Sequence, residues 1–444
     1  MERPATEVSL ISQPDDPLPP TRAAVLGLQH VLAMDVYIVP FIIASVLAFS
    51  VSDAASFIQS AFVAAGIATL IQSQLFMRMP IVQGPSFVPI GAVLAIAFAA
   101  GGGIAGLSAV VGALIPGAIL VMLLGSPTKI FHRLVARFVP PIVGGAIIIV
   151  VGVALMPVAL KESVFAVHGN ATVGGNIVLA FISAALLVGC MLTGMALGVK
   201  GTWLRLFSVI IALAAGCIVA AFMGQLSFAA VGDATWFSLP RIAFLNLDVT
   251  FSLSAALTML IVYIVVLAET TGTWFAIGAV IDKPLSDEQL DRGATGEGIG
   301  CLISALLCST PVTGYSSNAG IIAITGIASR VAFAAAGIFL VVFGLIGKLS
   351  AIIASIPGPV IGGVFGVLCV VIAMNGFRVV RSTVLNERNM LVIGLPILMA
   401  LFATLAPPDF VKTLPDFVQY ILGSSIAFGA VWAIVLHQVL PSTR

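Results

Sequence analysis

The chain has 444 residues, of which 60% are hydrophobic and only 8% are charged. Its mean hydropathy is +1.20, whereas soluble domains carry about 25% charged residues. A soluble enzyme is therefore excluded, and a polytopic membrane protein is expected. The net charge of +1 gives no reason to expect a nucleic-acid partner. The five cysteines lie in apolar runs without metal-site spacing, so we expect no metal and no cofactor.

The amino-terminal segment 1–21 is polar and proline-rich, and it lacks the apolar core of a signal peptide. We expect a disordered cytoplasmic tail there. A bilayer span needs about 20 apolar residues. This length predicts spans near 23–48, 54–76, 102–125, 139–160, 173–198, 202–223, 251–280, 331–354, 358–376, 389–406 and 415–438. Three shorter or interrupted spans, at 81–100, 296–309 and 313–329, would bring the total to fourteen.

The distribution of positive charge agrees with fourteen spans. If the amino terminus is cytoplasmic, the outer loops hold only Lys161, Arg241, Lys348 and Lys412, and every other Lys and Arg among the 19 faces inward. Cytoplasmic loops are the ones that concentrate Lys and Arg. Both termini are therefore expected in the cytoplasm, in a multi-pass protein of a cell membrane, with a bacterial inner membrane as the expected setting.

An internal repeat divides the chain. The run from Val139 to Gly145 (VPPIVGG) resembles the run from Ile356 to Gly363 (IPGPVIGG), about half the chain later. Seven spans in each half is an odd number, so the second copy would be inverted in the membrane, which is typical of secondary transporters. The segment between the halves, 224–248, is too polar to span, and we expect an external interfacial linker.

Two stretches in corresponding positions of the halves predict broken helices. Thr310–Arg330 and Met79–Pro89 both open with proline, glycine and polar residues before an apolar run. A helix that begins partway across a membrane leaves its first N–H groups facing a cavity, where they favour a polar or anionic ligand. Two such half-helices, the third and tenth spans, would point their amino termini at each other near mid-membrane.

Glu269 is the first candidate for a binding residue, because an acid at the centre of an apolar span is unfavourable by about 2.5–3.5 kcal/mol on insertion scales. It would accept hydrogen bonds from ligand N–H groups or take a proton, which would couple transport to protons. The structural alternative is a silent pair with a neighbouring donor. Thr273 lies one helical turn further on and is a second candidate for substrate contact.

The first span carries a second acid. Asp35 follows Gln29 and His30 on the same predicted helix, and Tyr37 comes two residues later as a candidate substrate contact. Asp35 is either a hydrogen-bonded structural acid or a second proton or cation site. His30 is either a satisfied buried histidine or a proton relay, and it could donate to a polar group on the 313–329 span.

The polar start of the tenth span supplies the remaining candidates. Ser316, Ser317 and Asn318 could cap the half-helix, with backbone N–H groups at the two serines facing substrate and Asn318 holding the crossing of the half-helices. Tyr315 and Phe87 offer flat faces for stacking a ring, although plain packing is equally compatible. No P-loop, zinc motif or Ser–His–Asp arrangement is present, so no catalytic residue and no enzyme activity are expected.

These motifs resemble the nucleobase–ascorbate transporter family, also called nucleobase:cation symporter 2, over nearly the whole chain. The resemblance is carried by Gly27–Met34 with its Gln-His pair, by Gln83-Gly-Pro-Ser86-Phe87, by Glu269-Thr-Thr-Gly272 and by Ser309–Gly326 with Asn318. The chain departs from the family pattern at Ser317, where Gln, Glu or Pro is usual, and at Thr273 and Asp35.

The resemblance implies an all-α fold of two inverted seven-span repeats. A core domain would comprise 22–125 and 251–355, and a gate domain 126–223 and 356–444, with 224–250 as external linker and the homodimer contact on the gate. It also implies secondary-active uptake of a purine such as xanthine or urate, coupled to protons or sodium. Glu269 would bind the base, with Phe87, Ser316 and Ser317 completing the site and Ser86, Gln83 and Tyr315 supporting it.

Two other functions fit the same architecture. One is a uracil or pyrimidine permease. The other is an anion exchanger or channel-like carrier of a small organic anion, because two facing half-helix amino termini suit an anion. The fixed negative charge of Glu269 argues against the anion carrier. Nothing in the sequence beyond isolated acids supports a membrane enzyme.

Overall fold

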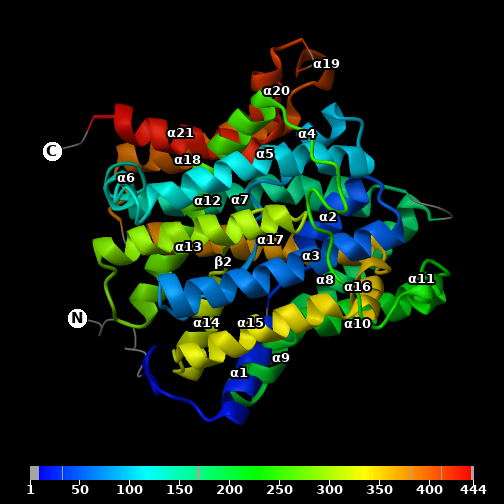
Figure 1. Cartoon of the computed structure of the whole chain (residues 1–444). Helices are drawn as coiled ribbons and strands as arrows, with labels where there is room; N and C mark the ends of the chain where they lie inside the picture. The colour runs from blue at the N-terminus through cyan, green and yellow to red at the C-terminus, as the bar shows by residue number, and fades with distance from the viewer. Residues whose placement is uncertain (1–9, 33, 168–170, 382, 412, 442–444) are drawn as a thin grey trace.

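The computed structural model describes residues 10–32, 34–167, 171–381, 383–411 and 413–441. Residues 1–9 of the predicted tail and Lys412 of the predicted outer loops lie outside this part of the chain. The described chain is mostly helical, and most of its long helices run roughly along one direction (Figure 1). This arrangement is expected of a membrane bundle, since helices satisfy their backbone hydrogen bonds internally.

The first half of the chain runs from α1 to α10 with one short strand. Its elements are α1 (Pro20–Leu32), α2 (Ile38–Val46), α3 (Val51–Leu70), η1 (Ile71–Phe76), β1 (Gln83–Pro85), α4 (Ile90–Ala99), α5 (Gly103–Leu124), α6 (Phe131–Phe138), α7 (Pro141–Val158), η2 (Ala159–Val164), α8 (Val173–Ala196), η3 (Gly198–Gly201), α9 (Thr202–Leu206) and α10 (Ser208–Phe222).

The second half follows a short linker helix and contains the other strand. Its elements are α11 (Ala229–Asp233), α12 (Leu253–Val280), α13 (Asp287–Leu306), β2 (Val312–Gly314), α14 (Ser317–Thr325), α15 (Arg330–Leu345), α16 (Gly347–Ala354), α17 (Gly358–Val380), α18 (Glu387–Leu405), α19 (Pro408–Val411), α20 (Asp416–Gly423) and α21 (Ser425–Val439).

Seven of the described helices are long and apolar enough to cross a membrane: α3 with η1, α5, α7 with η2, α8, α12, α17 and α18. Four shorter apolar helices, α4, α10, α15 and α21, accompany them. The other predicted spans fall on interrupted or more polar elements, so fourteen spans in two inverted repeats stays a prediction.

Several predicted spans differ from the helices observed. The span at 23–48 is two helices, because the chain leaves helical geometry between α1 and α2. The spans at 331–354 and 415–438 are also each divided in two, as α15 with α16 and α20 with α21. The span at 296–309 begins earlier, at Asp287, where Ser286 and Gln289 form a capping box.

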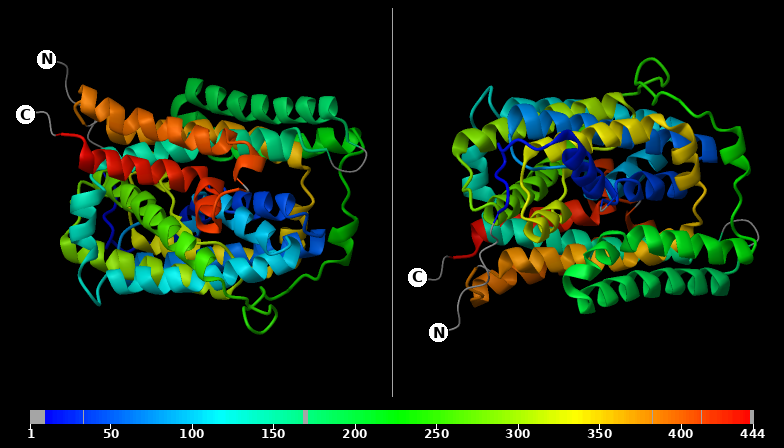
Figure 2. Two further views of the ribbon diagram at one scale, coloured as in Figure 1. Left: turned by 90° about the horizontal axis from the view of Figure 1, so that it is seen from above. Right: turned by 90° about the horizontal axis from the view of Figure 1, so that it is seen from below.

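The helices fall into two groups that face each other across the molecule. Figure 2 shows α8 and α18 along one side and α5 and α13 along the opposite side. Helices α7 and α17, which carry the two copies of the repeated motif, pack against each other between them. Close approach here depends on glycine: a Cβ at Gly152 would lie 2.5 Å from the backbone nitrogen of Ala373.

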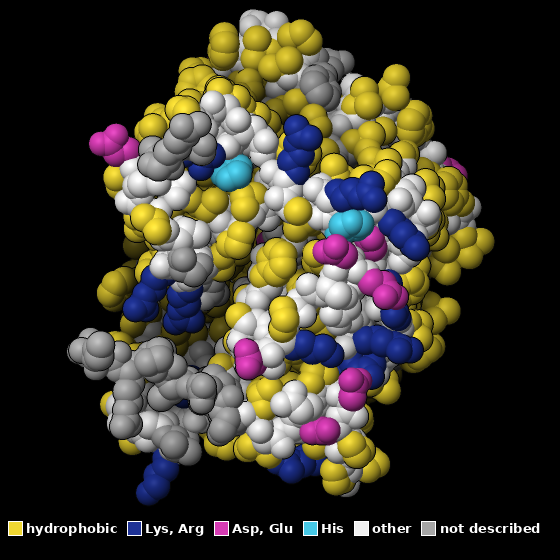
Figure 3. All heavy atoms as spheres, turned by 90° about the vertical axis from the view of Figure 1, so that its left-hand side faces the viewer, with side chains coloured by type: hydrophobic (Ala, Val, Ile, Leu, Met, Phe, Trp, Pro, Cys, Tyr) yellow, Lys and Arg dark blue, Asp and Glu magenta, His cyan; other side chains and the backbone are white. Residues whose placement is uncertain are grey.

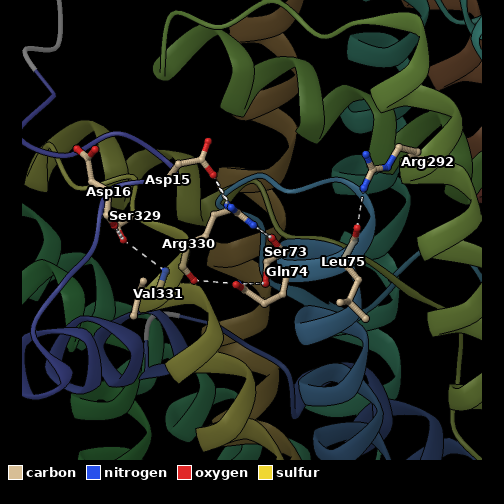
Figure 4. A network of polar contacts seen from close by, with 9 residues as sticks. All are labelled: Asp15, Asp16, Ser73, Gln74, Leu75, Arg292, Ser329, Arg330 and Val331. Carbon is tan, nitrogen blue, oxygen red and sulfur yellow. Dashed lines mark hydrogen bonds and ion pairs between the residues drawn. The ribbon is translucent and has the colours of Figure 1, made fainter.

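The amino-terminal segment differs from the expected unstructured tail over residues 10–19. Ser12 forms a parallel bridge with Ile327, and Asp15 forms an ion pair with Arg330 at the start of α15. Figure 4 shows this arginine also reaching the carbonyl oxygen of Ser73 in η1, at 3.4 Å. Composition alone does not reveal these contacts, because their partners, Ile327 and Arg330, lie more than 300 residues further along the chain.

The linker between the halves lies over the ends of α3 and α16. Arg241 forms an ion pair with Asp53 in the first turn of α3, and Gln59 donates a hydrogen bond to Ser238. The linker also keeps large apolar side chains such as Trp236 and Phe244 exposed. These features suit the interfacial position predicted from its composition.

Candidate functional site

The site is built on two three-residue strands inside the helical protein. Strand β1 pairs antiparallel with β2, so that Gly84 lies opposite Thr313. All six residues of the two strands are buried. Backbone that leaves helical geometry in an apolar interior needs another hydrogen-bond partner, and each strand supplies it to the other. The two stretches that the sequence singles out as broken helices are therefore in direct contact.

A half-helix follows each strand. Helix α4 begins at Ile90 and α14 begins at Ser317. Ser316 occupies the N-cap position of α14, but its side chain makes no capping hydrogen bond. The capping expected from this run of polar residues is therefore absent at Ser316, and its hydroxyl group is not engaged by the helix end.

A cavity of about 120 Å³ lies beside the strand pair. Its walls come from the loop between β1 and α4, from α7, α10, α12, β2, α14 and α17, and from the break between α1 and α2. The lining residues are Asp35, Phe87, Ile148, Val209, Glu269, Thr273, Thr313, Gly314, Tyr315, Ser316, Ser317, Leu368, Val371, Ile372 and Asn375.

Seven of the residues predicted from the sequence line this cavity: Glu269, Phe87, Thr273, Tyr315, Ser316, Ser317 and Asp35. Five do not: Tyr37, Ser86, Gln83, Asn318 and His30. The cavity therefore joins residues from four separate parts of the chain, and the five others lie around or behind it.

Glu269 stands in the middle of α12 and is fixed by the loop after β1. Ser86 Oγ donates a hydrogen bond to Glu269 Oε2 at 2.8 Å. Helix α12 is also tied to β2: Thr270 Oγ1 accepts from the Gly314 N–H at 3.1 Å, and Thr273 Oγ1 donates to the Gly314 carbonyl oxygen at 3.1 Å. The stretch of α12 that carries Glu269 is thus hydrogen-bonded to β2, and the carboxyl group itself to the loop after β1.

The two aromatic candidates are partly engaged by the protein itself. The Phe87 ring stacks on Phe365 of α17, with 5.5 Å between ring centroids and 13° between ring planes. Tyr315 donates its hydroxyl hydrogen to the Pro85 carbonyl oxygen at 2.9 Å. Phe365 therefore fixes the Phe87 ring at the cavity wall, and Tyr315 contributes a second, hydrogen-bonded aromatic wall.

His30 and Asn318 form a buried pair behind the cavity. His30 Nδ1 lies 2.9 Å from Asn318 Oδ1, and the imidazole packs on Phe333 with 4.4 Å between ring centroids. The contact between His30 and the tenth span that the sequence suggests is present, and it holds α1 against α14. A proton-relay role for His30 stays a prediction.

A second buried carboxylate lies on the other side of β1. Glu297 of α13 is 1% exposed, and its Oε2 accepts from Gln83 Nε2 at 2.8 Å and from Gln72 Nε2 at 3.2 Å. Glu297 is not among the site residues predicted from the sequence. An acid within the glycine-rich run 293–305 was the available signal for an interior position.

The cavity-lining residues that the sequence does not predict come from the opposite wall. Ile148 of α7, Val209 of α10 and three apolar residues of α17 face the cavity, together with the amide of Asn375. Apolar residues in apolar spans carry no distinguishing signal. A lone amide within the apolar run of α17 was the one feature that could have pointed to this helix.

A larger cavity of about 600 Å³ lies between α2, η2 and the start of α17. Its lining includes Phe41, Glu162 and Asn176. Phe41 also belongs to an apolar cluster with Val364 of α17, against which Tyr37 packs. Tyr37, predicted as a substrate contact, therefore lies in the apolar cluster and outside the lining of the smaller cavity.

Two solved structures share this fold at low sequence identity. The transmembrane domain of the cyanobacterial bicarbonate transporter BicA matches with a TM-score of 0.59 and 13% identity, covering 95% of this chain and 98% of that one. The structure of SLC26A9 matches with a TM-score of 0.59 and 12% identity, covering 94% of this chain and 65% of that one. These likenesses show the fold.

Several relatives share a higher sequence identity with this chain than these two structures do. The putative purine permease CPE0397 of Clostridium perfringens is 31% identical over 98% of this chain and 94% of its own length. The uric acid permease PucK of Bacillus subtilis is 32% identical over 93% and 94%, and the xanthine permease XanP of Escherichia coli is 28% identical over 96% and 93%. The model of the Permease family matches residues 21–408. The chain therefore belongs to this permease family, as its motifs predict, and is a transporter, not an enzyme.

Proposed function

We propose that the chain is a secondary-active permease that carries a purine nucleobase, the cargo class of its xanthine and uric acid permease relatives, through the cavity beside β1 and β2. The observation that carries the proposal is the position of Glu269: a carboxylate fixed by Ser86 in a small cavity with one aromatic wall at Phe87. A carboxylate accepts the N–H groups of a base edge, and an aromatic face packs against its ring.

The two sides of the cavity differ in residue type, which supports the proposal of a core domain that carries substrate and a gate domain that moves past it. Every lining residue with a carboxylate or hydroxyl group comes from segments 22–125 and 251–355, the proposed core. The proposed gate, 126–223 and 356–444, contributes apolar side chains and the amide of Asn375. An apolar wall has few hydrogen bonds to break when it slides, so substrate would stay with the core during alternating access.

Both ends of the described chain lie on the same side of the molecule (Figure 1). Figure 3 shows Lys and Arg side chains gathered on that face. This supports a cytoplasmic position for both termini in a bacterial inner membrane. The larger cavity, near η2 and the start of α17, would then form the outer vestibule.

Proton coupling is proposed through Glu269 and Asp35, which face the cavity, with His30 behind them; sodium is the alternative ion.

A homodimer is proposed through the gate. Exposed apolar side chains along α8 and α18, among them Phe181 and Phe402, suit either lipid or a second copy.

Uptake into proteoliposomes tests the proposal. Purified protein should accumulate radiolabelled purine when the outside is acidic, and a protonophore should remove the accumulation. A sodium gradient at equal pH serves as the control for the coupling ion. Accumulation under the sodium gradient alone would replace the proton by sodium. Failure of purines under both gradients, together with uptake of uracil or of an organic anion, would contradict the proposed cargo.

A further inference from the structure

Asp35 enters the cavity because the first membrane segment is interrupted. Helix α1 ends at Leu32 and α2 begins at Ile38, and the Ile38 N–H donates to the Asp35 carbonyl oxygen at 2.9 Å in the turn between them. The turn brings Asp35 to the cavity wall, on the same lining as Glu269. Two carboxyl groups therefore face a space of about 120 Å³.

Neither carboxyl group has a cationic partner in the described part of the chain. The ion pairs found there involve Asp291, Asp53 and Asp15, all outside the cavity. The cavity lining contains no Lys, Arg or His. Glu269 receives a hydrogen bond from Ser86, whereas no side chain of the described residues donates to Asp35. The Asp35 carboxyl group thus lines the cavity without a side-chain partner, and its oxygen atoms can accept hydrogen bonds from a ligand.

We propose that Asp35 makes this site selective for a neutral purine with N–H groups on both rings, such as guanine or hypoxanthine, over a purine anion such as urate. The inference rests on the proposed function and specifies its substrate class. Glu269 would accept from one edge of the base and Asp35 from another. When Glu269 and Asp35 are ionised, a purine that is already negative at neutral pH would meet like charge in this small space, whereas the N–H groups of a neutral purine would stabilise the ionised carboxyl groups.

The geometry also offers a place for the oxygen atom of such a base. Asn375 on the opposite wall is half-buried and makes no hydrogen bond among the described contacts. Its amide can donate to a carbonyl oxygen that projects toward α17. Acceptors on the core wall and a donor on the gate wall match a base that carries both N–H and C=O groups.

Dissociation constants of the purified protein for guanine, hypoxanthine and urate at neutral pH provide the test. We expect wild-type protein to bind the two neutral purines at least about tenfold tighter than urate, and Asp35→Asn to reduce that ratio about tenfold, chiefly by improving urate binding. The matched control is Asp248→Asn, which changes an exposed acid of the linker and should leave the ratio unchanged.

If Asp35→Asn fails to fold, the ratio of urate to neutral-purine dissociation constants in the wild-type protein still tests the inference. Asp35→Thr then provides the uncharged variant. Equal affinity of wild-type protein for urate and the neutral purines would overturn the inference, as would a ratio unaffected by loss of the Asp35 charge. The proposed function fails in a different way, namely if the wild-type protein binds no purine at all.

Discussion

Glu269→Gln is expected to abolish purine uptake while the protein still reaches the membrane and folds. Glutamine keeps the size of the side chain, and its amide oxygen can still accept from Ser86, so the wall of the cavity should persist. The charged acceptor is lost, however, and each hydrogen bond to a charged group contributes about 1.5–3 kcal/mol. That loss corresponds to roughly ten- to a hundredfold in affinity per bond, and a residue that cannot take a proton also cannot couple transport to protons.

The control for this variant is Ser86→Ala, which keeps the carboxylate and removes one hydrogen bond of 2.8 Å. It should lower uptake only in part, because it removes one hydrogen bond to the carboxylate, worth about 1.5–3 kcal/mol for a charged acceptor, and leaves the carboxylate itself to bind the base and take the proton. Initial uptake rates, normalised to the amount of folded protein from fluorescence-detected size exclusion, measure both variants. Wild-type uptake by Glu269→Gln would remove Glu269 from the transport mechanism.

Gly363→Ala is expected to destabilise the protein strongly. A Cβ at this position of α17 would lie 2.1 Å from the Ala180 carbonyl oxygen of α8 and 2.8 Å from the Ala180 carbonyl carbon. Both atoms are backbone, so relief requires one helix to move away from the other. Overpacking of this kind typically costs about 1–3 kcal/mol and occasionally more, and here it would separate helices of the proposed gate.

Gly366 provides a matched control one turn later on the same helix. No atom lies within 4 Å of the Cβ that Gly366→Ala would introduce. Alanine also favours a helix over glycine by up to about 1 kcal/mol, so this variant should match or exceed the stability of the wild type. Thermal unfolding in detergent measures both variants. Equal midpoints for Gly363→Ala and Gly366→Ala would show that α8 and α17 do not pack as closely as described.

The sequence predicts those parts of the site whose residue types are unfavourable in their surroundings. Glu269 stands out as an acid in an apolar span, and the proline, glycine and polar residues before the third and tenth spans identify both strands of the crossing. The structure places these features together, with Ser86 on Glu269 and His30 on Asn318. Such positions are recognisable because each violates a local rule of membrane helices.

The remaining features depend on contacts that a single sequence does not reveal. Ile148 and Val209 line the cavity through the packing of whole helices, and nothing in their type distinguishes them from lipid-facing neighbours. Phe365 covers one face of Phe87 although 278 positions separate them in the numbering. The break at Asp35 does not follow from the length rule, which treats 23–48 as one span; Pro40, in the first turn of α2, was the available signal.

The most direct test of the account is ligand-induced thermal stabilisation of the purified wild-type protein and of Glu269→Gln, with purines, pyrimidines, ascorbate and small carboxylates as ligands. A ligand at a hundredfold excess over its dissociation constant stabilises the native state by about 2.7 kcal/mol. If Glu269 binds the base, a purine raises the unfolding midpoint of the wild type and leaves that of Glu269→Gln unchanged. Stabilisation by a carboxylate or inorganic anion, with no response to any base, would contradict it.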